Sequence, residues 1–228
     1  MVKKLTNFLN LFLLFTLLIS CKSYSQLPKG FGYILNEIPT IEIELRYFGT
    51  NNFIGKPIDG YQKPVLIISS KAIIQLKEIQ KDLQKQNLGL KIFDAYRPQR
   101  AVNHFVIWAK DLNDTIQKPI FYPNVKKSVL FKEGYIASRS GHTRGSTLDL
   151  TIINLNTKQE LDMGSPYDFF GKESWVSHQN ITSKQQQNRQ LLQRVMKKHN
   201  FRNYPQEWWH FTLRNEPFPN TYFDFPIE

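Results

Sequence analysis

The chain has almost no cysteine: Cys21 is the single one among 228 residues, and none follows it. A disulfide within the mature protein is therefore excluded. Internal repeats, low-complexity linkers and long runs of like charge are also missing. The formal net charge is +11, but lysine and arginine are spread along the chain. This spread favours a solvated basic surface over a site for a polyanion, so nucleic acid is not an expected partner.

The composition that is present belongs to an ordinary globular protein, with 41% hydrophobic and 14% aromatic residues. It argues against disorder, and the length suits one domain with a sizeable core.

The N-terminus reads MVKKLTNFLNLFLLFTLLISCKSYSQ, in which two lysines precede an apolar run from Phe8 to Ile19. The run is shorter than the roughly 20 residues of a membrane-spanning helix and is typical of a secretory signal. We expect residues 1–25 to be a signal peptide and residues 26–228 to be the functional domain. The stretch from Leu18 to Cys21 resembles a bacterial lipobox, which predicts lipid attachment at Cys21 and an exported, periplasmic, membrane-anchored protein. Ordinary cleavage near Ser25 is the alternative.

Hydrophobic periodicity predicts a mixture of helices and strands without strict alternation. The expected helices are one that begins at Ser70, one that follows Pro98 and one over 183–199; the expected strands are 40–47, 90–94, 135–138, 148–153 and the stretch EWWHFTL. Short turns join several strands, so the pattern favours an α+β domain with a mainly antiparallel sheet and flanking helices.

The stretch SGHTRGSTLDL places His142 in a glycine-bounded loop and Asp149 in the strand that follows. Alternation along this strand turns Leu148 and Leu150 toward the core and Asp149 to the other face. With His210 from the later motif EWWH, these residues form a set of two imidazoles and one carboxylate. Such a set is a normal catalytic zinc shell with one open position. For the first motif alone, a hydrogen-bonded loop histidine is the simpler interpretation.

Two further residues have side chains suited to peptide hydrolysis. Glu207 precedes His210 by three residues, so a regular strand would point them to opposite faces, and both serve one site only if the backbone bulges. A carboxylate there can accept a proton from an attacking water. The alternative is a solvated Glu207 beside two core tryptophans. Arg97, in DAYRPQR, is suited to stabilising an oxyanion, an effect often worth about 3 to 4 kcal/mol; the alternative is a salt bridge to Asp94.

Together and in this order, the motifs resemble the D-alanyl-D-alanine dipeptidase family of zinc peptidases. The match runs from about Leu35 to Glu228, and it includes the stretches NNFIGKPIDGY, DAYRPQRAV, FYPN, SGHTRGSTLDLT, LDMGSPYDFF and EWWHFTLRNEPFPNTYFDFP. The resemblance implies a small α+β zinc fold, shared with D,D-carboxypeptidases and the hedgehog signalling domain.

The resemblance also implies one zinc ion per chain and assigns roles to particular residues. The implied metal ligands are His142, Asp149 and His210; the catalytic residues are Glu207 and Arg97; the substrate contacts are Tyr47, Tyr61, Ser140 and Asp168. Asp168 is suited to the ammonium of a dipeptide, and Ser140 or Arg97 to its carbonyl or carboxylate oxygens. We expect Trp208 and Trp209, with the two tyrosines, to wall a small pocket.

The expected activity is hydrolysis of D-Ala-D-Ala in cell-wall dipeptide turnover. The alternatives are a zinc D,D-carboxypeptidase that trims stem peptides and a non-catalytic lipoprotein that binds wall fragments.

Overall fold

The computed structural model describes residues 27–228, and the predicted signal peptide and lipobox lie outside them. The helices are α1 (Ile34–Glu37), α2 (Ser70–Gln84), α3 (Gln99–Lys110), α4 (Lys118–Phe121) and α5 (Ser183–Lys198). The strands are β1 (Phe31–Tyr33), β2 (Glu42–Ile43), β3 (Ile67–Ser69), β4 (Leu88–Asp94), β5 (Thr147–Asn154), β6 (Phe201–Tyr204) and β7 (Glu207–Leu213). Short 3-10 helices cover Arg46–Phe48, Lys127–Val129, His142–Arg144 and Lys172–Ser174. Within the described residues, no helix is long and apolar enough to cross a membrane.

The main sheet has five strands in the order β2-β4-β5-β7-β6. β4, β5, β7 and β6 pair antiparallel, whereas β2 runs parallel to β4. The α+β class is therefore confirmed, but the sheet is mixed rather than purely antiparallel. The parallel pair arises because the chain leaves β2 and returns through β3 and α2 before it enters β4. A separate pair, β1 and β3, is antiparallel.

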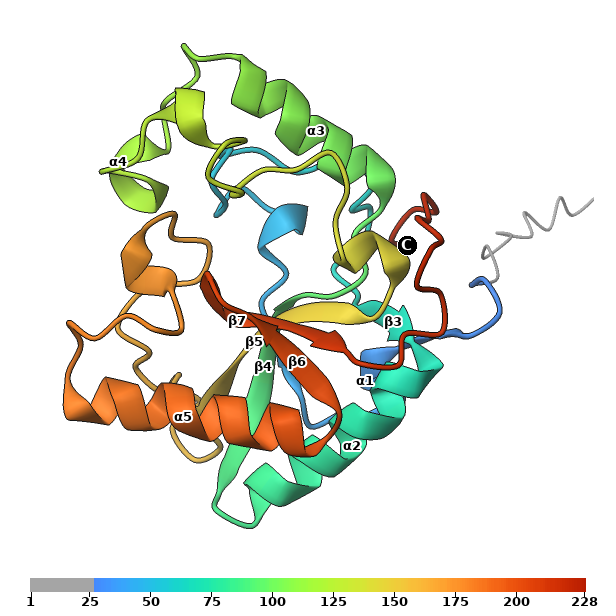
Figure 1. Ribbon diagram of the computed structural model, residues 1–228. Coiled ribbons are helices and arrows are strands. Elements are labelled where there is room, and N and C mark those ends of the chain that lie inside the picture. Colours follow the sequence, from blue (N-terminus) through green and yellow to red (C-terminus); the bar gives the residue numbers. More distant parts are fainter. Residues whose placement is uncertain (1–26) are drawn as a thin grey trace, which may run out of the picture.

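Helices α2 and α5 cover one face of the sheet (Figure 1). Leu76 and Ile79 of α2 and Leu192 and Met196 of α5 are fully buried in the same apolar cluster as the inward residues of β4 and β5. Thr182 and Gln185 form a reciprocal capping box that begins α5. The main core lies on this face, where the two helices pack against the central strands.

The other side of the molecule contains a second apolar cluster, rich in aromatic rings, around α3. Phe105 and Trp108 of α3 pack there with Phe53, whose ring centroid lies 5.0 Å from each of theirs. In Figure 1, α3 and the loops beside it stand apart from α2 and α5, with the sheet between them. Polar residues of β5 lie between this cluster and the main core.

Two predicted strands differ from the structure. The expected strand 40–47 is reduced to Glu42–Ile43, because the chain turns into a 3-10 helix at Arg46. The expected strand 135–138 is wrong. The backbone N–H groups of Tyr135 and Ile136 both donate to the carbonyl of Leu130, so they are used in a local turn instead of a ladder. Helices α2, α3 and α5 and strands β4 and β5 lie where their periodicity predicts them.

Candidate active site

The three central strands bring the acidic and imidazole side chains together. In the sheet register, Asp149 of β5 is the Cα partner of Asp94 on β4 and of His210 on β7. His142 comes from the 3-10 helix just before β5. The face of β5 opposite the main core carries Thr147, Asp149 and Thr151, as the alternation predicts, although it too is buried.

His142, Asp149 and His210 form a compact triangle of ligand atoms, and the structure thereby groups them as a candidate metal site. His142 Nε2 lies 3.3 Å from Asp149 Oδ1 and 3.3 Å from His210 Nδ1, and His210 Nδ1 lies 3.1 Å from Asp149 Oδ1. In a tetrahedral zinc site with bonds of about 2.0–2.2 Å, neighbouring ligand atoms lie about 3.3–3.6 Å apart. Asp149 Oδ1 is buried and accepts no hydrogen bond from the described residues. The donor set therefore fits zinc.

A backbone contact fixes the orientation of the first imidazole. His142 is fully buried, and its Nδ1 lies 2.7 Å from the carbonyl oxygen of Ala95. A carbonyl only accepts, so Nδ1 carries the proton and Nε2 keeps its lone pair toward Asp149 and His210. Such a partner on the second nitrogen is typical of metal-binding histidines.

The electrostatics of the triangle favour a cation. Burial lowers the pKa of His142. Burial alone would raise the pKa of Asp149, but His142 and His210 outweigh it and hold that pKa below its usual range. Burial would likewise lower the pKa of His210, yet the adjacent carboxylates of Asp149 and Glu207 raise it to about 9. A permanently negative Asp149 is thus the group that balances positive charge here.

The bulge that Glu207 requires is present in β7. Along the β6–β7 pair, Asn203 faces Phe211 but Tyr204 faces Glu207, so the register shifts between these positions. The shift brings Glu207 Oε2 within 3.3 Å of His210 Nδ1. The side chain is a quarter exposed, so its carboxylate reaches both the metal-ligand triangle and the open cleft.

Arg97 forms the salt bridge to Asp94 that the sequence offered as one interpretation, and its side chain also lines the cavity. Its Nε donates to Asp94 Oδ2 at 2.9 Å, and its terminal nitrogen lies 3.5 Å from Asp149 Oδ2. The guanidinium carbon is 5.0 Å from the ring centroid of Tyr47 and 5.2 Å from that of Phe105. Burial would lower the pKa of Arg97, but the surrounding acidic groups raise it, so the side chain stays charged. The salt bridge holds the guanidinium at the edge of the site.

Sequence reasoning offered Asp94 only as a salt-bridge partner of Arg97 and did not identify its contact with Tyr61. This carboxylate is fully buried and accepts from Arg97 and, at 2.8 Å, from the hydroxyl of Tyr61. Burial raises its pKa, while Arg97 and His142 oppose that rise. Tyr167, also not identified, donates to Asp149 Oδ2 at 3.2 Å.

A cavity of about 490 Å³ opens over the triangle. Its lining includes Glu207, Arg97, the three candidate ligands and, among the expected substrate contacts, Tyr47, Ser140 and Asp168. Tyr61 lies behind Asp94 and does not line it. Trp208 and Trp209 do not wall it either, because both are buried in the main core.

Asp168 has an unusual environment at one end of this cavity. It is buried, its backbone is left-handed with φ of 61°, and its Oδ2 accepts a 2.8 Å hydrogen bond from the hydroxyl of Tyr47. Burial, with the nearby charge of Asp149, raises its pKa well above the usual range. Such a carboxyl gains strongly from a cationic ligand.

Comparison with known proteins agrees with this geometry. Residues 31–228 match a family model, Peptidase_M15, described as D-ala-D-ala dipeptidase. A D-alanyl-D-alanine dipeptidase of Enterococcus faecium is 37% identical over 199 residues, which cover 87% of this chain and 98% of the relative. A protein of the same name from Enterococcus faecalis is 36% identical over 201 residues, covering 88% and 100%. One from Streptomyces coelicolor is 36% identical over 197 residues, covering 86% and 98%.

Proposed function

Because the chain belongs to the D-Ala-D-Ala dipeptidase family of peptidases, we propose that it hydrolyses D-alanyl-D-alanine to two D-alanines with one zinc ion bound. The ion would be held by His142, Asp149 and His210. The observation that carries the proposal is the triangle of ligand atoms, with its spacing of 3.1–3.3 Å and with the carboxylate of Glu207 next to it.

In the proposed hydrolysis, Glu207 and Arg97 have different roles. Zinc, when bound, polarises the scissile carbonyl and lowers the pKa of a water molecule. Glu207 accepts the proton of the attacking water and then donates it to the departing amine of the second alanine. Arg97, kept charged and held by Asp94, stabilises the negative charge that develops on the carbonyl oxygen.

The two ends of a free dipeptide match polar groups of the cavity. The N-terminal ammonium would pair with the carboxylate of Asp168, whose position is fixed by the Tyr47 hydroxyl. The hydroxyl of Ser140, which lines the cavity in the loop before His142, would donate to an oxygen of the substrate. Recognition of the ammonium requires a free N-terminus next to the scissile residue, which favours dipeptides over the longer stem peptides of a D,D-carboxypeptidase. In this scheme Tyr61 acts indirectly, through Asp94.

We also propose that the protein is exported and attached to a membrane through a lipid on Cys21. The support is the N-terminal sequence alone, with its charged start, short apolar run and lipobox-like stretch. An exported enzyme meets dipeptides released from the wall, so its role would be cell-wall dipeptide turnover.

The test uses the purified chain from Gln26 onward, with and without a chelator. We expect hydrolysis of D-Ala-D-Ala but not of L-Ala-L-Ala, loss of activity with chelator and recovery with added zinc. A pentapeptide that ends in D-Ala-D-Ala is the third substrate. Faster release of D-alanine from the pentapeptide would favour the carboxypeptidase, and binding without any turnover would favour the non-catalytic lipoprotein.

A further inference from the structure

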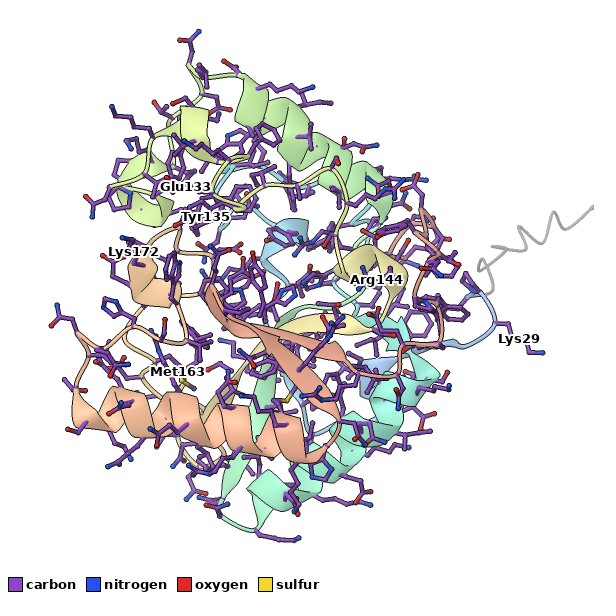
Figure 2. The ribbon with its side chains drawn as sticks, viewed as in Figure 1. Lys29, Glu133, Tyr135, Arg144, Met163 and Lys172 are labelled. Atoms are coloured by element: carbon purple, nitrogen blue, oxygen red, sulfur yellow. The ribbon has the colours of Figure 1, made fainter. Side chains whose placement is uncertain are left out.

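A second cavity, of about 640 Å³, opens beside the candidate active site. Arg144 and Arg202 line both cavities, so the two adjoin at these side chains. The second cavity is also lined by Lys71, Arg214 and Glu216. Figure 2 labels Arg144 at the side of the sheet where this basic lining begins.

The lining of this cavity has more positive than negative charge. Its carboxylate, Glu216, accepts two hydrogen bonds from Arg144, at 2.9 and 2.8 Å, and lies 3.4 Å from Arg202. Lys71 and Arg214 are exposed and form no ion pair with any described residue. Glu216 therefore offsets one of the four positive charges, which it shares between Arg144 and Arg202, and the lining holds no further carboxylate. A concave surface of one sign attracts ligands of the opposite sign.

The lining of the active-site cavity includes charges of both signs, because it holds Asp168 together with Arg144 and Arg202. A dipeptide whose ammonium pairs with Asp168 therefore has these two arginines, which also line the basic cavity, within the same cavity as its C-terminal residue.

We infer that the basic cavity binds a carboxylate on the side chain of the second residue, so that the enzyme also hydrolyses dipeptides such as D-Ala-D-Glu. This inference rests on the proposed dipeptidase function. Arg202 and Arg214 supply planar guanidinium groups that bind a carboxylate by paired hydrogen bonds, and Lys71 adds a third charge. The reaction is unchanged: one water is consumed, the same peptide bond breaks, and D-alanine and D-glutamate are released.

The experiment compares D-Ala-D-Glu with D-Ala-D-Gln, which has nearly the same shape but no side-chain charge. In the wild-type protein we expect kcat/KM for D-Ala-D-Glu to be about tenfold higher, the size of one charge-assisted interaction. The ratio should fall toward one in the double variant Arg202→Gln, Arg214→Gln, and it should shrink as salt is added. Arg194→Gln is the matched control, because Arg194 is an exposed arginine on α5 without an ion pair to the described residues. It should keep the wild-type ratio.

A wild-type ratio near one, or a ratio that the double variant retains, overturns the inference. If the double variant does not fold, Arg214→Gln alone decides, since that side chain is exposed and unpaired among residues 27–228. Hydrolysis of D-Ala-D-Ala in the same series tests the proposed function separately. If no dipeptide is hydrolysed, calorimetry still decides the inference by measuring how tightly D-Ala-D-Glu and D-Ala-D-Gln bind to the Glu207→Gln variant. Tighter binding of D-Ala-D-Glu supports the inference, and equal binding of the two dipeptides overturns it.

Discussion

The imidazole of His142 is anchored to the carbonyl of Ala95 across 2.7 Å, and Ala95 directly follows Asp94 and precedes Arg97 by two residues. One short segment after β4 thus sets the tautomer of a candidate metal ligand and also carries Arg97, the proposed stabiliser of the oxyanion. The orientation of His142 and the position of Arg97 therefore depend on the same stretch of backbone.

The first prediction concerns metal content. His210→Ala removes one of three ligands and leaves only His142 and Asp149, so we expect purified protein with little or no zinc. His199→Ala is the control, since His199 lies at the end of α5 and pairs with Asp82. Elemental analysis of both variants and of the wild type measures the effect. Full zinc occupancy in His210→Ala would remove this residue from the metal site.

The second prediction separates catalysis from metal binding. Glu207→Ala keeps all three ligands, so zinc content should match the wild type while kcat falls by about 10²–10⁴, the usual contribution of a general base. Glu133→Ala removes an exposed carboxylate on a loop outside the active-site cavity and should leave kcat unchanged. Turnover of D-Ala-D-Ala at saturating substrate is the measurement. Wild-type rates in Glu207→Ala would contradict the assigned role.

Local patterns predicted the scaffold better than the site. The amphipathic spacing of Leu76, Ile79, Leu192 and Met196 marks α2 and α5, because helical burial repeats within a few residues. The expected strand at Tyr135 is instead a turn, because its backbone N–H groups bond to Leu130 while the Tyr135 ring stacks on Phe170. The buried Ile136 beside Tyr135 gives a turn the local composition of a strand.

The metal-ligand set depends on pairing between distant strands. The register that places Asp149 beside His210 joins β5 to β7, which are separated by α5 and β6 in the sequence. Spacing alone could not predict that contact, and the resemblance to a known family supplied it. For Arg97, the sequence offered a salt bridge or a catalytic role as alternatives. The structure places the Asp94 salt bridge at the edge of the cavity, so the two are compatible.

The third prediction is a pH dependence of substrate binding. Burial and the charge of Asp149 raise the pKa of Asp168, and only the ionised carboxylate can pair with the substrate ammonium. As the pH falls through this raised pKa, KM for D-Ala-D-Ala should rise. The rise should begin at a pH well above about 3.9, the ordinary pKa of an exposed aspartate. Asp168→Asn should raise KM at neutral pH and should abolish the further rise of KM at lower pH. Its effect on kcat should be smaller.

The pH profile of KM, recorded for wild type and Asp168→Asn, measures this dependence. Tyr47→Phe is the companion variant, because it removes the hydrogen bond to Asp168 and keeps the ring. In Tyr47→Phe, KM should still rise as the pH falls, but the pH at the midpoint of that rise should shift. An unchanged KM in Asp168→Asn would exclude Asp168 from substrate binding.

The fourth prediction concerns Gly145, which closes the loop of His142. Its φ is +77°, and a Cβ there would lie 2.2 Å from Cε1 of Phe31. The Phe31 ring cannot yield easily, because it stacks on Phe218 and meets Tyr96 edge-on. Gly145→Ala should therefore lose at least about 1–3 kcal/mol of unfolding free energy and should bind zinc more weakly.

Gly49→Ala separates this effect from a general cost of replacing glycine. At Gly49, φ is −109° and the nearest atom to an added Cβ is 3.9 Å away, so the change in unfolding free energy should stay within about 0.5 kcal/mol. Urea denaturation of both variants compares the two positions. Equal stabilities would mean that the loop relaxes around the methyl group added at Gly145 without strain. The left-handed turn at Gly145 would then not be needed to hold His142, whose imidazole is also bound by the Ala95 carbonyl.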